Sequence, residues 1–169
     1  KCLYNQSPRL ISSFLDSYSR TVVISDRTRE EGLNLQGNNR TVIHFDLPLD
    51  PNRIEQRLGR VDRYGGNDFK CYLLDDESNR YLASWIEVII KNVEVFDRSI
   101  ASLQFVLENE LKQVENEIIT KGIDTFVDFG ERLSGDRGLI QTELKRILEQ
   151  ENLDAIPKPL FDDFEKVEI

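Results

Sequence analysis

The sequence lacks the features that mark membrane-spanning and secreted proteins. Its 169 residues contain no run of about 18 apolar residues, so we expect no membrane-spanning helix and no membrane partner. It has no Met, and it begins at Lys1 without the charged and apolar regions of a signal peptide, so we expect a piece of a longer protein. The two cysteines, Cys2 and Cys71, have neither metal-binding nor disulfide spacing. Reduced thiols in a cytoplasmic protein are therefore predicted.

Basic residues are scarce after the first third of the chain. The formal net charge is −9, and residues 1–66 hold 10 Lys and Arg against 8 Asp and Glu, whereas residues 67–169 hold 12 against 23. Lys and Arg supply most of the affinity for nucleic-acid phosphates. We therefore expect any nucleic-acid contact in the first 66 residues, and a solvated or protein-facing surface in the remainder.

Short β-branched runs alternate with turn residues and one helix in the first half of the chain. Strands are predicted at residues 21–25, 41–47 and 69–74. A helix should begin at Asp50-Pro51, because Asp accepts the free amide bonds of a helix start and Pro suits its first position. It should end near Val61. Strands that alternate with a helix predict an α/β fold with a parallel sheet.

From Ser78 onward the pattern becomes helical. Apolar residues recur every three or four positions from Leu82 to Ile118, which predicts one amphipathic helix, or two joined near Asp97-Arg98, ending at Lys121-Gly122. Two shorter helices are predicted at residues 125–133 and 139–151. The mixed spacing favours a packed core face over a coiled-coil seam. The predicted regions are an α/β part at residues 1–77, a helical appendage at 78–156 and an acidic tail at 157–169 after Pro157.

Residues 54–63, with the sequence I-E-Q-R-L-G-R-V-D-R, concentrate the chemistry of the chain. The pattern Q-R-x-G-R-x-x-R is formed by Gln56, Arg57, Gly59, Arg60 and Arg63. Three guanidinium groups so close together repel one another unless an anion lies among them, and the planar fork of Arg suits a phosphate. Gly59 would permit close backbone packing or a helix bend. The alternative is a solvated basic face paired with Glu55 and Asp62, and the complete pattern disfavours it.

This stretch resembles motif VI of superfamily 2 helicases and translocases, which projects arginine fingers from lobe two onto ATP bound by lobe one. Residues 29–36, R-E-E-G-L-N-L-Q, resemble motif V of Swi/Snf-type ATPases, although Thr28-Arg29-Glu30 stands where the family often has small residues. Residues 45–51, F-D-L-P-L-D-P, resemble the link between the two motifs, with Asp50 in place of the usual Asn. The resemblance covers about residues 20–75. The later helices are similar in layout to bacterial RapA-like proteins, the polymerase-associated Swi/Snf relatives.

The resemblance implies a fold and a set of residue roles. The fold is a partial RecA-like parallel-sheet lobe of the P-loop NTPase type, followed by an all-helical appendage. Arg60 and Arg63 would be the catalytic fingers on the γ-phosphate. The nucleotide cleft would include Gln56, Arg57, Gly59, Asp26, Glu31 and Gly32. Ser25, Arg27, Arg29 and Asn34 would contact nucleic acid.

Half of a nucleotide site is missing from the sequence. No G-x-x-x-x-G-K-[ST] loop cradles phosphates and no D-E-x-H run holds magnesium, so ATP with Mg²⁺ would be bound mainly by lobe one. The chain alone should hold no cofactor or metal ion and should not hydrolyse ATP. The expected partners are double-stranded DNA, lobe one of the same chain and a protein on the acidic helices. The alternative function is a non-catalytic docking module; an RNA helicase is disfavoured by the G-L-N-L turn.

Three further features favour structural roles. His44 is the only histidine and lies in a predicted strand, which is more typical of a hydrogen-bonded interior or edge residue than of a catalyst. Trp85 lies on the apolar face of a helix and is interpreted as a core anchor. The acidic run at residues 75–77 favours a helix start over a cation site.

Overall fold

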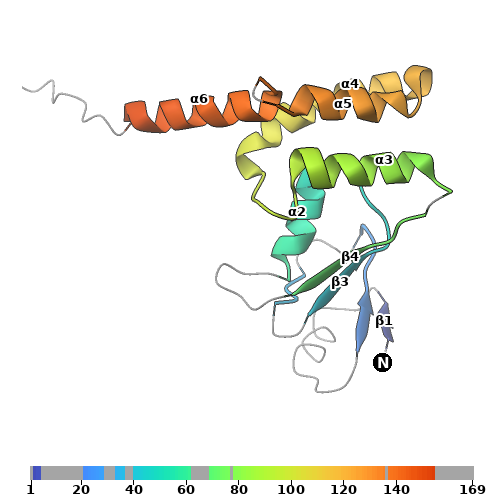
Figure 1. Cartoon of the computed structure of the whole chain (residues 1–169). Coiled ribbons are helices and arrows are strands. Elements are labelled where there is room, and N and C mark those ends of the chain that lie inside the picture. The colour runs from blue at the N-terminus through green and yellow to red at the C-terminus, as the bar shows by residue number, and fades with distance from the viewer. Residues whose placement is uncertain are drawn as a thin grey trace, which may run out of the picture.

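The computed structural model describes residues 2–4, 21–28, 33–36, 40–61, 69–76, 78–135 and 137–154. The strands are β1 (Cys2–Tyr4), β2 (Val22–Ile24), β3 (Thr41–His44) and β4 (Lys70–Leu73). The helices are α2 (Pro51–Gly59), α3 (Arg80–Val88), α4 (Gln104–Lys121), α5 (Asp124–Leu133) and α6 (Leu139–Asp154), with a π-helical turn η1 (Ile89–Val93) and a 3-10 turn η2 (Ala101–Leu103). Figure 1 shows the strands at one end of the molecule, α2 in the middle, and the other helices gathered at the opposite end.

The strands form two parallel pairs. Cys2 lies opposite Val22 in the pair of β1 with β2, and Thr41 lies opposite Lys70 in the pair of β3 with β4. The predicted strands at 21–25, 41–47 and 69–74 are therefore confirmed in place and direction, although each is shorter than expected. β1 is an additional strand that the sequence did not lead us to predict. Parallel strands need a crossover, and α2 supplies it between β3 and β4, as in other α/β folds.

Helix α2 begins as its sequence predicts. The Oδ1 atom of Asp50 accepts a hydrogen bond from the backbone N–H of Asn52 at 3.0 Å, and Pro51 is the first helical residue. The helix ends at Gly59, two residues before the expected end at Val61. The side chain of Ile54 is fully buried against the helices that follow the sheet. α2 therefore joins the strands to the helical part.

Of the two alternatives for the long apolar stripe, the structure has two helices with a break near Asp97-Arg98. α3 continues into η1 and stops at Glu94, which has a left-handed backbone with φ of 59°. Residues 94–100 are irregular, and η2 leads into α4. Gly122, also at positive φ, ends α4 where the sequence predicts. Helices α5 and α6 follow within a few residues of their expected bounds.

The apolar stripe forms a packed core, as the mixed spacing predicts. The core contains Ile54, Trp85, Val88, Ile89, Val93, Val95, Ile100, Leu103, Leu107, Leu111, Val114, Phe126, Phe129, Leu133 and Ile140. Trp85 is a core anchor: its ring lies 5.7 Å from that of Phe126, and its Nε1 donates to the carbonyl oxygen of Pro48 at 3.1 Å. This last bond fixes α3 to the segment that precedes α2.

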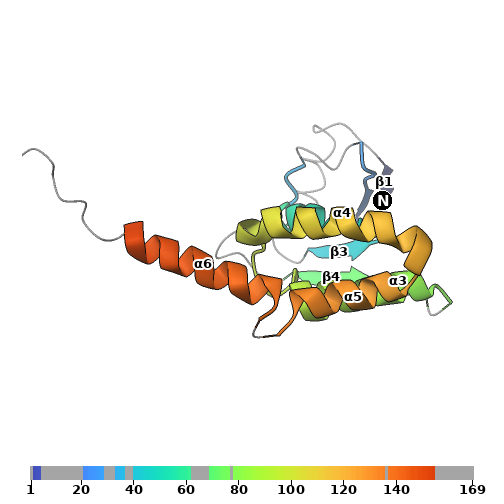
Figure 2. The same cartoon turned by 90° about the horizontal axis from the view of Figure 1, so that it is seen from above.

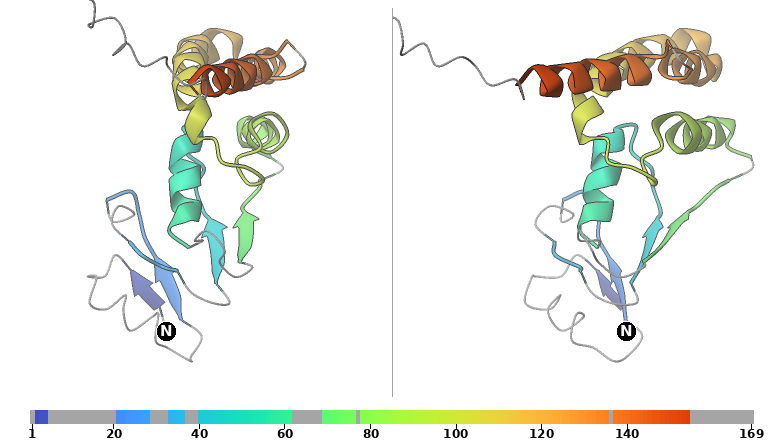
Figure 3. Two further views of the ribbon diagram at one scale, coloured as in Figure 1. Left: turned by 90° about the vertical axis from the view of Figure 1, so that its left-hand side faces the viewer. Right: turned by 60° about the vertical axis from the view of Figure 1, so that its left-hand side comes forward.

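The helical part has a protruding end. Figures 2 and 3 show α6 running out past the other helices, away from the strands. Among the described residues, no helix is long and apolar enough to cross a membrane. The predicted acidic tail lies outside the described residues, and the boundary at residue 77 stays a prediction. Because Ile54 shares one core with α3 to α6, the helical part packs directly on the α/β part.

Candidate functional site

The structure brings the two predicted motifs together at the end of α2. The backbone N–H of Leu35, from the motif V segment, donates to the carbonyl oxygen of Arg60 at 2.9 Å. The Nε atom of Arg60 is buried and has no hydrogen-bond partner among the described residues. A buried guanidinium N–H without a partner costs free energy, and an anionic oxygen is the group that would best satisfy it. The Nε–H of Arg60 is therefore a donor that no described group uses.

Arg57 is held by the loop that follows β3. Its Nη1 donates to the backbone oxygen of Asp46 at 2.9 Å and to the Oδ1 of the same residue at 3.2 Å. The Arg57 side chain is only 14% exposed, whereas that of Asp46 is 77% exposed. In this conformation Arg57 braces the link between β3 and α2. A direct role of Arg57 in the nucleotide cleft stays a prediction.

The alternative interpretation of this helix supposes that Glu55 pairs with the basic face. The structure shows that it does not. Its Oε1 accepts from the hydroxyl of Ser99 at 2.7 Å and from the backbone N–H of Ile100 at 3.0 Å. Both partners lie in the irregular segment between η1 and η2. α2 is thus fastened to the helical part on one side, while Arg57 and Arg60 are held by the loops of the α/β part.

Gln56 and Gly59 are exposed on α2. A methyl group at Gly59 would meet no atom within 4 Å, so the expected close packing at this glycine is wrong for the part of the chain that the structure describes. The exposed position leaves both residues accessible to a second lobe. Their role in the cleft is a prediction that this geometry permits.

The segment after β2 contains the other predicted site residues. Asp26 closes a tight turn, because its Oδ1 accepts from the backbone N–H of Thr28 at 2.9 Å and from the Thr28 hydroxyl at 2.6 Å. Ser25, Arg27 and Asn34 are exposed. The Oδ1 of Asn34 accepts from the backbone N–H of Gln36 at 3.3 Å. Arg29, Glu31, Gly32 and Arg63 lie outside the described residues.

His44 ends β3 in an environment that the sequence did not reveal. Its side chain is 3% exposed, and its ring makes an edge contact with Phe96 at 6.1 Å between centroids. The expected hydrogen-bonded histidine is not found, because Nε2 has no partner among the described residues. Burial lowers the pKa of His44, the charge of Arg57 lowers it further, and Asp46 partly opposes both. His44 is therefore a neutral packing residue.

This burial predicts a loss of stability on acidification. Below the ordinary pKa of 6.5 the unfolded chain takes up a proton at His44 that the folded chain does not, so the free energy of unfolding should fall as pH drops from about 7 to about 5. Above about pH 7 His44 is neutral in both the folded and the unfolded chain, so it should add nothing to the pH dependence of the unfolding free energy. Urea unfolding of the wild type and of His44→Phe across this range is the measurement. The variant should lose much of the pH dependence; an equal slope in both proteins would contradict the assignment.

No group of three or more His, Cys, Asp or Glu side chains that could hold a metal ion occurs among the described residues. The predicted site residues of α2 contribute mainly donors: the guanidinium groups of Arg57 and Arg60, and the amide N–H groups of Gln56. Such a set can bind an anion but cannot hold Mg²⁺, which takes oxygen ligands. The chemistry available here is stabilisation of negative charge.

Comparison with known proteins identifies this region. Residues 3–65 match the helicase conserved C-terminal domain. The chain is 41% identical to the RNA polymerase-associated protein RapA of Vibrio campbellii over 69 residues, 39% of this chain and 7% of that protein. The RapA protein of Vibrio parahaemolyticus gives the same figures. That of Proteus mirabilis is 30% identical over 98 residues, 56% of this chain and 10% of that protein.

The chain thus matches a tenth or less of the length of these curated relatives. No solved structure matches it significantly. The matched family segment includes both predicted motifs, most of strand β1, strands β2 and β3, and helix α2. Residues 3–65 therefore resemble helicase C-terminal domains, and in this region the chain is similar to the RapA proteins.

Proposed function

We propose that this chain is the C-terminal part of lobe two of an ATP-driven translocase that moves on double-stranded DNA in the cytoplasm and remodels protein–DNA complexes. The observation that carries the proposal is the contact between the motif V segment and Arg60, whose buried Nε lacks a partner among the described residues. The other lobe would bind ATP with Mg²⁺. Arg60, with Arg63, would reach the γ-phosphate across the cleft between the lobes.

The physical role of these arginines follows from the reaction. Negative charge on the γ-phosphoryl group redistributes during transfer, and a positioned guanidinium stabilises it in a site that excludes water. The exposed Ser25, Arg27 and Asn34, with Arg29, would hold DNA phosphates without reading bases. The contact of motif V with Arg60 would then connect the DNA-binding and nucleotide-binding elements through a single backbone hydrogen bond.

A second candidate function is a non-catalytic docking module. It is favoured by the acidic helices, since residues 78–154 hold 15 Asp and Glu against 9 Lys and Arg. The relatives are named for association with RNA polymerase. By extension we propose that the helical part of this chain binds a protein partner. Both functions are compatible within one longer protein, because they use different ends of the molecule.

Because half of a nucleotide site is missing from the sequence, we predict that the pure chain does not turn over ATP, with or without duplex DNA. The sequence has no Walker A loop to cradle phosphates, so nucleotide affinity should also be weak. Phosphate release and binding of a fluorescent ATP analogue measure the two quantities. DNA-stimulated turnover by the pure chain would show that it contains a complete site and would contradict the proposal.

A further inference from the structure

Helix α2 is held by the helical part at two points. Before its first turn, the Nε1 atom of Trp85 donates to the carbonyl oxygen of Pro48 at 3.1 Å. In its middle, the Oε1 atom of Glu55 accepts one hydrogen bond from the hydroxyl of Ser99 at 2.7 Å and another from the backbone N–H of Ile100 at 3.0 Å. The position of α2 therefore depends on the helical part as well as on the strands.

The side of α2 that carries Glu55 differs from the side that carries the arginines. Successive residues of an α-helix are turned by about 100°, so Arg57 and Arg60 lie roughly opposite Glu55 around the helix axis. Arg57 is held on that side by Asp46, whose backbone oxygen accepts from its Nη1 at 2.9 Å. Hydrogen bonds to a carboxylate are about twice as strong as those between neutral groups. α2 is thus anchored on both sides, and Glu55 supplies the anchor on the helical side.

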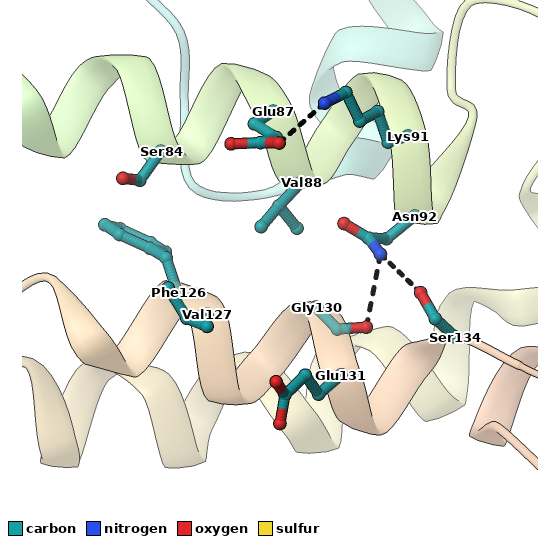
Figure 4. Close-up of a pocket in the computed structure, with 10 residues that line it drawn as sticks. All are labelled: Ser84, Glu87, Val88, Lys91, Asn92, Phe126, Val127, Gly130, Glu131 and Ser134. Carbon is teal, nitrogen blue, oxygen red and sulfur yellow. Dashed lines mark hydrogen bonds and ion pairs between the residues drawn. The ribbon is translucent and has the colours of Figure 1, made fainter.

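The segment that receives Glu55 is itself fixed within the helical part. Ile100 is fully buried in the core, a few residues after η1. On η1, the Nδ2 atom of Asn92 donates to the carbonyl oxygen of Gly130 at 3.2 Å and to the hydroxyl of Ser134, so η1 is joined to α5 (Figure 4). A side chain at position 130 would come within 3.0 Å of the Asn92 Oδ1, so the glycine permits this approach. Glu55 is therefore bonded to a packed part of the core.

The end of α2 carries Arg60, the residue of the candidate site. The carbonyl oxygen of Arg60 accepts from the backbone N–H of Leu35 at 2.9 Å. Because α2 has nine residues and Arg60 caps its end, movement on the Glu55 side would displace Arg60 and this bond together. A catalytic group displaced by about 1 Å can lose about 100-fold in rate. The anchor at Glu55 thus bears directly on the geometry of the site.

We propose that Glu55 is a positioning residue for Arg60: its hydrogen bonds to the segment between η1 and η2 hold α2 where the guanidinium reaches the γ-phosphate. The helical part is then a component of the motor site, in addition to any docking role. The catalytic consequence rests on the proposed function, whereas the effect on the position of α2 does not. Two measurements therefore test the proposal, and one of them needs no nucleotide.

The first measurement is amide hydrogen exchange at Leu35, followed by NMR on the full 169-residue chain. Glu55→Ala removes both bonds and should speed exchange of the Leu35 amide at least about fivefold, because its bond to Arg60 opens more often. Glu55→Gln keeps an acceptor oxygen for the same two donors and should change the exchange rate less than about twofold. Urea unfolding of the same variants measures any general loss of stability.

The second measurement is ATP hydrolysis in a protein that joins this chain to a nucleotide-binding lobe. Glu55→Ala should lower kcat at least about tenfold while the KM for ATP changes less than about twofold, since the loss concerns the transition state. Glu55→Gln should retain at least about half of the wild-type kcat, because both bonds can still form. Ser99→Ala removes one donor and should cost less. In the Glu55→Ala background it should add almost nothing.

Glu110→Ala is the matched control. The Oε2 atom of Glu110 accepts from the Nε of Arg132 at 2.8 Å, and its side chain is 19% exposed, so this carboxylate joins α4 to α5 without touching α2. The substitution should lower the unfolding free energy. It should nevertheless leave kcat and the Leu35 exchange rate within about twofold of the wild type, because the opening at Leu35 is local.

Other results would overturn the proposal. Unchanged kcat in Glu55→Ala, where Arg60→Ala abolishes turnover, would show that the anchor does not serve catalysis. Equal losses in Glu55→Ala and Glu55→Gln would assign the effect to charge, and an equal loss of turnover in Glu110→Ala would assign it to stability. Retained hydrolysis in Arg60→Ala would refute the proposed function instead, and exchange at Leu35 would still decide whether Glu55 positions α2.

Discussion

Replacing Arg60 with alanine should lower ATP hydrolysis at least about 100-fold in a protein that joins this chain to a nucleotide-binding lobe, while ATP binding stays nearly intact. Arginine fingers in phosphoryl-transfer enzymes contribute about 10³ to 10⁵ in rate, because they stabilise charge in the transition state more than in the bound substrate. Arg60→Lys should fail as well, since a single point charge cannot replace the guanidinium fork. Steady-state turnover and equilibrium binding of an ATP analogue separate the two effects.

The matched control for this prediction is Arg80→Ala. Arg80 is exposed at the start of α3 and lies in the helical part, outside the predicted motifs. Removal of the Arg80 side chain should leave turnover unchanged. This result would show that the fall in ATP hydrolysis in Arg60→Ala is not caused by the loss of one positive charge alone. Full activity of Arg60→Lys would show that Arg60 acts only as a surface charge. Loss of nucleotide binding in Arg60→Ala would show instead that Arg60 binds the substrate ATP rather than the transition state.

Local patterns predicted most of the elements because their causes are local. Asp50-Pro51 specifies the start of α2 through one capping bond, and Gly122 ends α4 by adopting a positive φ. The break after η1 falls where the apolar stripe is interrupted by Asp97-Arg98. Its immediate cause, the left-handed backbone of Glu94, could not be predicted, because glutamate rarely adopts that conformation.

The site was predictable in composition but not in its contacts. The pattern at residues 56–63 identified the arginines, yet the anchor of Arg57 on Asp46 joins residues 11 apart, and Glu55 meets residues 44 and 45 positions away. Only the fold brings such groups together. The same holds for His44, whose ring contacts Phe96 and whose pKa is lowered by burial and by the charge of Arg57. The roles of Arg29, Glu31, Gly32 and Arg63 stay predictions from the sequence.

Phe129→Ala should cost about 3 to 5 kcal/mol of unfolding free energy, the usual range for a buried Phe replaced by Ala. Phe129 is fully buried on α5, its ring stacks on that of Trp85 at 6.3 Å, and the guanidinium of Arg132 lies 5.9 Å from its centre. The substitution removes both contacts and leaves a cavity between α3 and α5. Small domains are stable by only about 5 to 15 kcal/mol, so the substitution should remove a substantial part of the unfolding free energy.

Phe105→Ala is the matched control for this substitution, because Phe105 is 75% exposed on α4. It should change stability by less than about 0.5 kcal/mol. Urea unfolding followed by circular dichroism and by Trp85 emission measures both variants, and the two probes should agree for Phe105→Ala. Equal losses for both phenylalanines would contradict the core described here. A large loss for Phe129→Ala that leaves the His44-dependent pH slope unchanged would show that the helical core and the end of β3 contribute independently to stability.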